Sequence, residues 1–193
     1  MNNQSISIVI PTYKEAANIP FLASRIARAL PKENYLHEIV IVDDNSCDGT
    51  EAAVKELQVE HDIHLIVRKH ERGLASAVID GIRCAKGEII VVMDADLSHP
   101  PEKIPELIDQ ILCHHSDFVI GSRFVAGGSS PHFNSFRKMN ALVSKLLAWP
   151  LTTVKDPMAG FFAFRKNLIK NADDLNPLGF KIGLEILVKT NPR

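Results

Sequence analysis

Two aspartates one residue apart, Asp94 and Asp96, follow a short apolar run and have the chemistry of a divalent-cation site. The run, residues 88–93, is typical of a central strand in a parallel sheet, and open α/β sheets bind ligands at the carboxyl ends of such strands. Neighbouring carboxylates repel unless a cation or water compensates them, so we interpret the pair as holding a metal ion with a diphosphate. The structural alternative is that Asp94 caps a turn and Asp96 caps the following helix.

Further polar side chains follow the other predicted strands. Tyr13 and Glu15 come after the strand expected at residues 5–10, and Asp44 ends the strand expected at 38–44. The Tyr13 ring can stack on a base, while the two carboxylates can accept hydrogen bonds from base or ribose donors. Each residue alone is typical of a turn. Their convergence at adjacent strand ends, together with the aspartate pair, indicates a nucleotide site.

Two common phosphate-binding motifs are missing. The first predicted strand ends in Pro11 and Thr12 without a G-x-G-x-x-G sequence, which disfavours an enzyme of hydride transfer. The chain has no Walker A motif, which disfavours a P-loop ATPase. What the strand ends offer instead is an aromatic ring and carboxylates.

The alternation of strands and helices predicts the fold class. Parallel neighbours need crossovers that cover the sheet, so the pattern predicts an α/β fold with a mostly parallel central sheet and helices on both faces. Asn18 is expected to cap the first helix. The strands are expected at residues 5–10, 38–44, 64–68, 88–93, 118–122 and 159–164, and the helices at 18–30, from 50 onward, and at 74–85, 101–113, 137–149 and 182–188.

Composition narrows the class of protein and its partners. With 193 residues, 46% apolar content and a formal net charge of −1, the chain is expected to form one globular domain without the basic surface that nucleic acid requires. Cys47, Cys84 and Cys113 lack C-x-x-C spacing, which fits free thiols in the reducing cytoplasm. No apolar run is long enough to span a bilayer and none resembles a signal peptide, so contact with a membrane is expected to be peripheral.

Several short motifs occur in a definite order along the chain. They are IVIPTYKE at 8–15, VDDNS at 42–46, DGT at 48–50, DADLSHPPE at 94–102, GSRF at 121–124, DPMAGFF at 156–162 and GFKIG at 179–183. This ordered set resembles family 2 glycosyltransferases with the GT-A fold, a Rossmann-like fold of nucleotide-diphospho-sugar transferases. More narrowly, it resembles the dolichol-phosphate mannosyltransferases. The resemblance implies one catalytic domain, residues 1–193, with a loop and helix at about 124–150 on the acceptor side.

That resemblance also implies which residues bind the donor. The nucleoside pocket would be lined by Pro11, Tyr13, Glu15, Val42 and Asp44, and the diphosphate and its metal would be met by Asp94, Ala95 and Asp96. Carboxylate oxygens suit Mg²⁺ or Mn²⁺, so the two aspartates are the expected ligands. Ser98 stands where some relatives have Gln, and it is a third candidate ligand, directly or through a water molecule.

The implied acceptor is a polyprenyl phosphate such as dolichyl phosphate. Such a phosphate is largely dianionic at neutral pH because its second pKa is about 6, so it needs positioning more than a general base. Arg123 and Arg137 are the candidates, because guanidinium forks bind phosphate in bidentate fashion. Lys181 is expected to neutralise charge on the donor. Together with Asp96, the two arginines are the expected catalytic residues of a single displacement that inverts the anomeric carbon.

The resemblance favours transfer of mannose from GDP-mannose to the lipid phosphate. Two alternatives remain open, which are a UDP-glucose-dependent polyprenyl-phosphate glucosyltransferase and a non-catalytic nucleotide-sugar-binding subunit. Family members generally continue beyond the point at which this sequence stops, so the C-terminal part of the family domain is expected to be missing. A membrane-anchoring subunit or a missing C-terminal membrane segment would then bring a cytoplasmic, peripheral enzyme to its acceptor.

Overall fold

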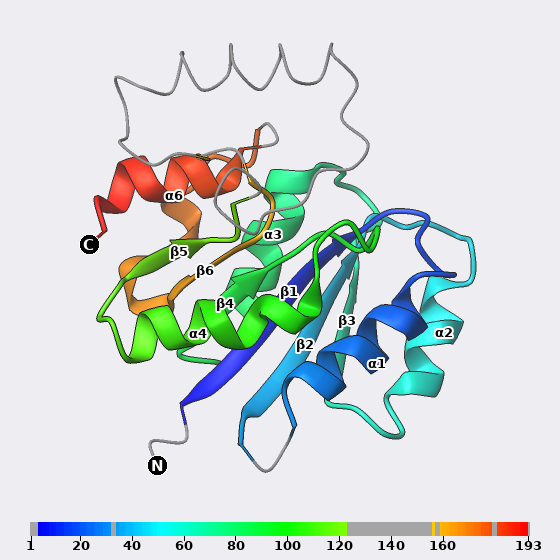
Figure 1. Ribbon diagram of the computed structural model, residues 1–193. Coiled ribbons are helices and arrows are strands. Elements are labelled where there is room, and N and C mark those ends of the chain that lie inside the picture. Colours follow the sequence, from blue (N-terminus) through cyan, green and yellow to red (C-terminus); the bar gives the residue numbers. More distant parts are fainter. Residues whose placement is uncertain (1–3, 32–33, 123–155, 157–158, 179–180, 193) are drawn as a thin grey trace, which may run out of the picture.

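The computed structural model is built around one six-stranded sheet with the strand order β3-β2-β1-β4-β6-β5 (Figure 1). It describes residues 4–31, 34–122, 156, 159–178 and 181–192. The predicted loop and helix at about 124–150 on the acceptor side lie outside these residues.

Four consecutive strands form the parallel part of the sheet. They are β1 (Ser5–Thr12), β2 (Leu36–Asp43), β3 (Ile63–Val67) and β4 (Ile89–Val92). All of the ladders among them are parallel, with β1 in the middle between β2 and β4. The three inner strands are rich in β-branched residues and buried on both faces, as strands of a covered parallel sheet are.

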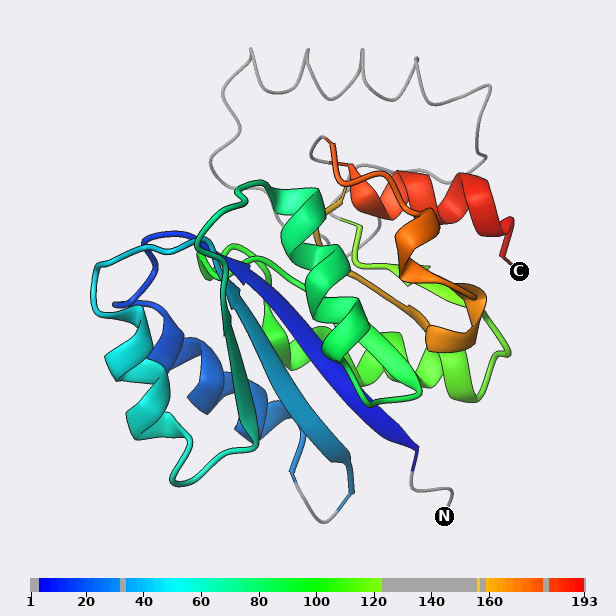
Figure 2. The same cartoon turned by 180° about the vertical axis from the view of Figure 1, so that it is seen from behind.

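Helices cover both faces of the sheet, as the sequence predicts (Figures 1 and 2). One face packs against α1, α2 and α4, and the other against α3 and α6. Each face has its own hydrophobic cluster because alternate strand residues point to opposite sides. The helices are α1 (Ile19–Ala29), α2 (Thr50–Leu57), α3 (Leu74–Cys84), α4 (Ile104–Leu112) and α6 (Ile182–Thr190), with 3₁₀ turns η1 (Pro101–Lys103), η2 (Lys166–Leu168) and η3 (Ala172–Asp174).

The last two strands add an antiparallel edge to the sheet. The strand β6 (Phe162–Arg165) lies between β4 and β5 (Phe118–Ile120) and is antiparallel to both. Its phenylalanines stack with Phe118, whose ring centroid lies 5.3 Å from that of Phe162 and 5.8 Å from that of Phe164. These three rings pack in one hydrophobic cluster with Ile182 and Ile186 of α6.

Asn18, the predicted cap of α1, lies at the expected position but makes a different hydrogen bond from the one expected of a cap. Asn18 occupies the N-cap position, yet its side chain makes no capping hydrogen bond. Its amide instead donates to the Glu15 carboxylate, at 2.5 Å between Nδ2 and Oε2. The Asn18 side chain therefore fixes the loop after β1 through its amide N–H, while its oxygen accepts no capping hydrogen bond from the helix.

The carboxyl ends of the parallel strands lie at one edge of the sheet. The register pairs Thr12 with Asp43 across β1 and β2, and Val9 with Val92 across β1 and β4. The loops after these strands, which carry the predicted site residues, therefore begin at the same edge. Within the described part of the chain, no helix is long and apolar enough to cross a membrane.

A surface ion pair joins α1 to η1 behind this edge. Arg25 donates from Nε and a terminal nitrogen to the two carboxylate oxygens of Glu102, at 2.8 and 2.7 Å. This bidentate contact holds the pKa of Glu102 below its usual value. Because the folded-state pKa is the lower one, the stabilisation is present above the ordinary carboxyl pKa and is lost as the pH falls through the folded-state value.

We therefore expect Glu102→Gln to reduce the free energy of unfolding at pH 7 by at most about 1 kcal/mol, because both side chains are solvent-screened. The difference between parent and variant should shrink as the pH falls below the ordinary carboxyl pKa, and it should vanish once the parent carboxylate is protonated in the folded state as well. Urea unfolding over a series of pH values measures it. A difference that persists in acid would show that the carboxylate charge is not responsible.

Candidate functional site

Asp94 is held in place by a buried histidine. It follows β4, and its Oδ2 lies 3.0 Å from Nε2 of His99. His99 is only 3% exposed, and its ring stacks on Phe161 with centroids 5.4 Å apart. His99 thus orients one oxygen of the predicted metal ligand Asp94, which leaves Oδ1 available for a cation.

Gly160 provides the space beside this pair. A β-carbon at residue 160 would lie 2.8 Å from Oδ2 of Asp94 and 3.3 Å from Nε2 of His99. Contacts that short do not occur between real side chains, so the glycine allows the backbone before β6 to approach the carboxylate closely. The segment that leads into β6 therefore helps to shape the site.

Asp96 is exposed and takes part in a turn. Its Oδ1 accepts a hydrogen bond from the backbone N–H of Ser98 at 2.9 Å, and the intervening Leu97 has a positive φ of 61°. The structural alternative that Asp96 caps the following helix is wrong, because the N-cap of η1 is Pro100, that of α4 is Lys103, and neither has a side-chain capping bond. Ala95 between the two aspartates is buried, which makes their side chains point away from the core. Ser98 is exposed beside them.

The donor set at this edge fits a hard divalent cation. Two carboxylates from a single short loop provide oxygen ligands, and each keeps an oxygen that the contacts with His99 and Ser98 do not use. Mg²⁺ and Mn²⁺ typically take one or two carboxylates and fill the remaining positions with water and phosphate oxygens. The residues present therefore fit the metal that the sequence predicts.

An open pocket joins three of the predicted donor-binding residues. Pro11 at the end of β1, Asp94 after β4 and Lys181 at the start of α6 all line it. Its floor is apolar, and it continues to Gly160 and to the first turn of α3. A lysine that faces a carboxylate across a pocket suits a ligand that carries both a metal-bound diphosphate and a further negative charge.

The loop after β1 carries an exposed aromatic ring flanked by cations. Tyr13 is 46% exposed, with the Arg72 guanidinium 5.2 Å and Lys14 Nζ 5.4 Å from its ring centroid. Glu15, the predicted partner of a base or ribose, accepts from Asn18 and is half-buried. Arg72 is a site residue that sequence reasoning missed, because nothing local in the sequence links it to Tyr13.

The loop after β2 is fixed by Asp43. This buried aspartate accepts from both the backbone N–H and the hydroxyl of Ser46, whose oxygen in turn accepts from the N–H of Lys14 at 2.7 Å. Lys14, Asn45 and Cys47 have positive φ values of 61°, 55° and 52°. Such strained backbone is found where surrounding contacts impose it, often at functional sites.

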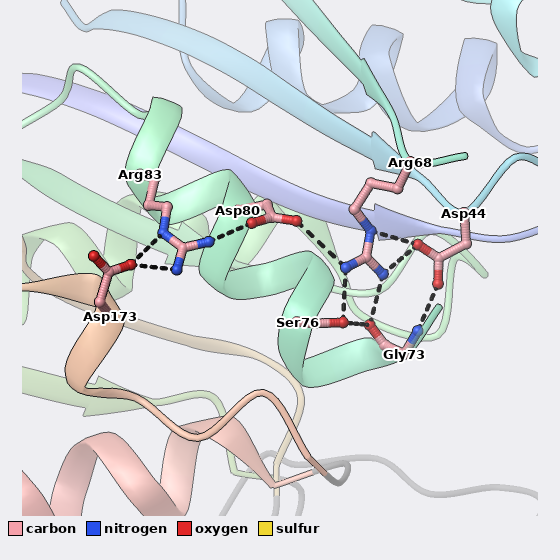
Figure 3. A network of polar contacts seen from close by, with 7 residues as sticks. All are labelled: Asp44, Arg68, Gly73, Ser76, Asp80, Arg83 and Asp173. Atoms are coloured by element: carbon pink, nitrogen blue, oxygen red, sulfur yellow. Dashed lines mark hydrogen bonds and ion pairs between the residues drawn. The ribbon is translucent and has the colours of Figure 1, made fainter. Parts of the chain in front are cut away.

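Asp44 belongs to a buried network rather than to an open surface (Figure 3). Its Oδ1 accepts two N–H groups of Arg68, with a distance of 2.7 Å to Nε, and its Oδ2 accepts from the N–H of Gly73 at 2.8 Å. Arg68 also donates to Ser76 at 2.7 Å and to the Gly73 carbonyl at 2.9 Å. A hydrogen-bond donor on a ligand could reach only the remaining lone pair of Oδ2, because Arg68 and Gly73 already occupy the other acceptor positions of the carboxylate.

The network continues along α3 to the C-terminal part of the chain. Asp80 contacts Arg68 at 3.4 Å and Arg83 at 2.6 Å, and Arg83 donates through Nε to Asp173 at 3.0 Å (Figure 3). Arg68 is 24 residues from Asp44 and follows β3, so only the parallel pairing of β2 and β3 brings the two side chains together. Sequence reasoning missed it for that reason.

Other predicted residues are placed differently or lie outside the description. Val42 is fully buried in the core, so only its backbone could face a ligand. Arg123 and Arg137 lie outside the described residues, and their predicted contact with an acceptor phosphate stays a prediction. Asp156 is buried, and its Oδ2 accepts from the hydroxyl of Ser122 at 3.3 Å.

Comparison with known proteins identifies the family. Residues 7–172 match the sequence profile described as glycosyl transferase family 2. The chain belongs to this family. Among curated relatives of this family 2 chain are two dolichol-phosphate mannosyltransferases. The protein from Pyrococcus furiosus is 47% identical over 188 residues, which are 95% of this chain and 52% of that protein. The protein from Saccharomyces cerevisiae is 39% identical, over 95% of this chain and 70% of that protein.

Solved structures confirm the GT-A fold for this family 2 chain. A glucosyl-3-phosphoglycerate synthase from Mycobacterium tuberculosis, crystallised with Mn²⁺, UDP-glucose and phosphoglyceric acid, superposes with a TM-score of 0.73. The two are 20% identical, and the match covers 97% of this chain and 65% of that structure. The family 2 chain spans about half the length of the Pyrococcus relative.

Proposed function

We propose that the chain is the donor-binding and catalytic part of a metal-dependent inverting glycosyltransferase that moves mannose from GDP-mannose to dolichyl or another polyprenyl phosphate. The observation that carries the proposal is the identity of 47% and 39%, over 95% of the chain, to two proteins named dolichol-phosphate mannosyltransferase. The arrangement of Pro11, Asp94 and Lys181 around one pocket supports it independently.

The donor diphosphate would be bound between acidic and basic side chains. Asp94 and Asp96 would hold Mg²⁺ or Mn²⁺, which would neutralise charge on the departing nucleoside diphosphate. Lys181 faces the same pocket and would add a positive charge on the side of α6. His99 would keep the Asp94 carboxylate in its orientation while the ligand enters and leaves.

The nucleoside would lie over the loops after β1 and β2. Tyr13 offers an exposed ring for stacking, with Arg72 beside it. Asp44 would accept one hydrogen bond from the base or ribose through Oδ2, since Arg68 and Gly73 hold its carboxylate in place. Pro11 would form an apolar wall, and Val42 could contact the ligand only through its backbone.

The acceptor would attack without a protein base. A lipid phosphate is mostly dianionic at pH 7, so its oxygen can form a bond to the anomeric carbon without losing a proton. The bond between that carbon and the β-phosphate oxygen breaks, and its electron pair leaves with the nucleoside diphosphate. Attack from the opposite side inverts an α-linked donor to a β-linked product. Arg123 and Arg137 would hold the acceptor phosphate in line.

A lipid acceptor requires access to a membrane surface. We propose that the protein acts peripherally on the cytoplasmic side, with an anchoring subunit or a further segment of the protein bringing it to the bilayer.

We expect transfer of labelled mannose from GDP-mannose to a short polyprenyl phosphate in the presence of Mn²⁺, and its loss on chelation. The organic-extractable product and the configuration of its anomeric carbon are the measurements. UDP-glucose serves as the competing donor in the same assay. Transfer of glucose but not mannose would contradict the proposed donor, and donor binding without any transfer would contradict the catalytic assignment.

Gly160→Ala tests the pocket behind Asp94. The added methyl would press on the Asp94 and His99 pair, which lies within 3.3 Å of it. We expect kcat/KM for the donor to fall by about 10- to 100-fold. An Asp94 carboxylate that is displaced would bind the metal less tightly and would align the donor less well. Thermal unfolding measured alongside separates this effect from a loss of folded protein. Unchanged kinetics would contradict the role of Gly160 in shaping the site.

A further inference from the structure

Three metal-ligating side chains meet at the amino end of the parallel strands. Glu38 lies near the start of β2, Asp62 precedes β3, and His64 lies within it. One ligand atom of each residue lies within 4.8 Å of the others. Asp44 is six residues after Glu38, which is about 20 Å at the usual rise per strand residue. This cluster therefore cannot be part of the site at Asp94 and Asp96, at the opposite edge of the sheet.

Glu38 is a buried carboxylate whose second oxygen lies beside the ring of His64. Its side chain is 7% exposed, and its Oε1 accepts from the hydroxyl of Ser7 at 2.6 Å and from the N–H of Lys86 at 2.5 Å. Its other oxygen, Oε2, lies 3.2 Å from Nε2 of His64. Both hydrogen-bond donors at Oε1 are neutral, so the charge of this buried group has to be balanced on the Oε2 side.

His64 points a buried nitrogen between two carboxylates. Its Nε2 lies 3.2 Å from Oε2 of Glu38 and also 3.2 Å from Oδ1 of Asp62. The nitrogen is fully buried, yet within the described part of the chain it has no partner with hydrogen-bond geometry. A ring nitrogen this close to two carboxylate oxygens, without a hydrogen bond to either, is placed to share a cation with them.

We propose that Glu38, Asp62 and His64 bind a zinc ion. Ligands at tetrahedral angles and about 2.0–2.1 Å from zinc are about 3.3 Å apart, which matches the spacing of the histidine nitrogen from both oxygens. One imidazole and two carboxylates are a zinc donor set, whereas Mg²⁺ prefers oxygen alone. The cation supplies the charge that the buried Glu38 carboxylate lacks.

The exposed side of the cluster leaves room for a fourth ligand. The Asp62 side chain is 63% exposed and that of His64 is 41% exposed. A water molecule completes the coordination there. Because the ligands come from β2, β3 and the loop between α2 and β3, the ion joins the edge strand to the centre of the sheet. Zinc bound in this way stabilises the folded chain.

The test uses the full chain freed of metal with a chelator and then dialysed against Zn²⁺. We expect the parent to retain about one zinc ion more per chain than His64→Gln, and zinc to raise the melting temperature of the parent alone by about 5 °C. Co²⁺ in place of zinc should give the visible absorption of a tetrahedral site in the parent but not in the variant. Asp62→Asn, at an exposed position, should behave as His64→Gln does.

Two variants serve as controls. His114→Gln removes an exposed histidine after α4 and should keep zinc, and Asp96→Asn should keep it as well because that residue lies at the other edge of the sheet. Equal zinc content and equal thermal shift in the parent and in His64→Gln would overturn the proposal.

Discussion

Asp96→Asn is expected to lower metal-dependent kcat/KM for the nucleotide-sugar donor by at least about 100-fold, because it removes a charged oxygen ligand of the metal. The asparagine oxygen can still accept from the N–H of Ser98, as Oδ1 of Asp96 does at 2.9 Å, so the turn itself is retained. Donor affinity should be measured with and without Mn²⁺. We expect Asp96→Asn to bind the donor more weakly than the parent in the presence of Mn²⁺ and equally well without it.

Asp109→Asn is the matched control for this change. Asp109 lies on the exposed side of α4, and its replacement removes the same charge without touching the strand ends. We expect its kinetics to equal those of the parent. If Asp96→Asn kept a normal Mn²⁺-dependent donor affinity, the assignment of this aspartate as a metal ligand would be wrong.

Arg68→Met is expected to destabilise the fold by about 3–5 kcal/mol, because it leaves the buried Asp44 carboxylate without its cation. It should also raise the KM for the donor, since Asp44 would lose the contact that orients it towards the ligand. Urea unfolding and steady-state kinetics measure the two effects. Arg68→Lys should recover part of the stability but less of the orientation, because an ammonium cannot form the two parallel bonds.

Arg83 on α3, at the other end of the same network, provides the control (Figure 3). Its side chain is 46% exposed, so Arg83→Met should cost less than about 1 kcal/mol. A double variant, Asp44→Asn with Arg68→Met, should be more stable than the sum of the single changes predicts, because the unpaired charge is then absent. If Arg68→Met and Arg83→Met lowered the free energy of unfolding equally, the assignment of Arg68 as the partner of the buried Asp44 charge would be wrong.

The parallel part of the fold could be predicted from short-range patterns. The strand expected at residues 88–93 is observed as Ile89–Val92, and the helix expected at 74–85 as Leu74–Cys84. Apolar runs and helical periodicity depend on neighbours within a few residues, so they are visible in the sequence. The insertion of β6 between β4 and β5 was not predictable in this way, since it depends on the packing of Phe118 against Phe162 and Phe164.

The candidate site, too, could be predicted from the sequence only in part. The positions of Asp94 and Asp96 after β4 followed from the sequence, because a strand end fixes where the next residues begin. The pairing of Asp44 with Arg68 could not be found there. The two residues are 24 positions apart, and only the ladder between β2 and β3 brings them into contact.

By itself, the sequence determined the order of strands and helices, the family and the edge of the sheet at which a nucleotide sugar would bind. The tertiary structure alone decided which side chains orient the ligand-binding residues at that edge, and which side chains come together at the opposite end of the strands. His99 orients Asp94, and Glu38 faces His64 across two strands, in arrangements that no local pattern encodes. The physical reason is that burial and charge pairing act between residues that are close in space, whereas periodicity records only residues that are close in the chain.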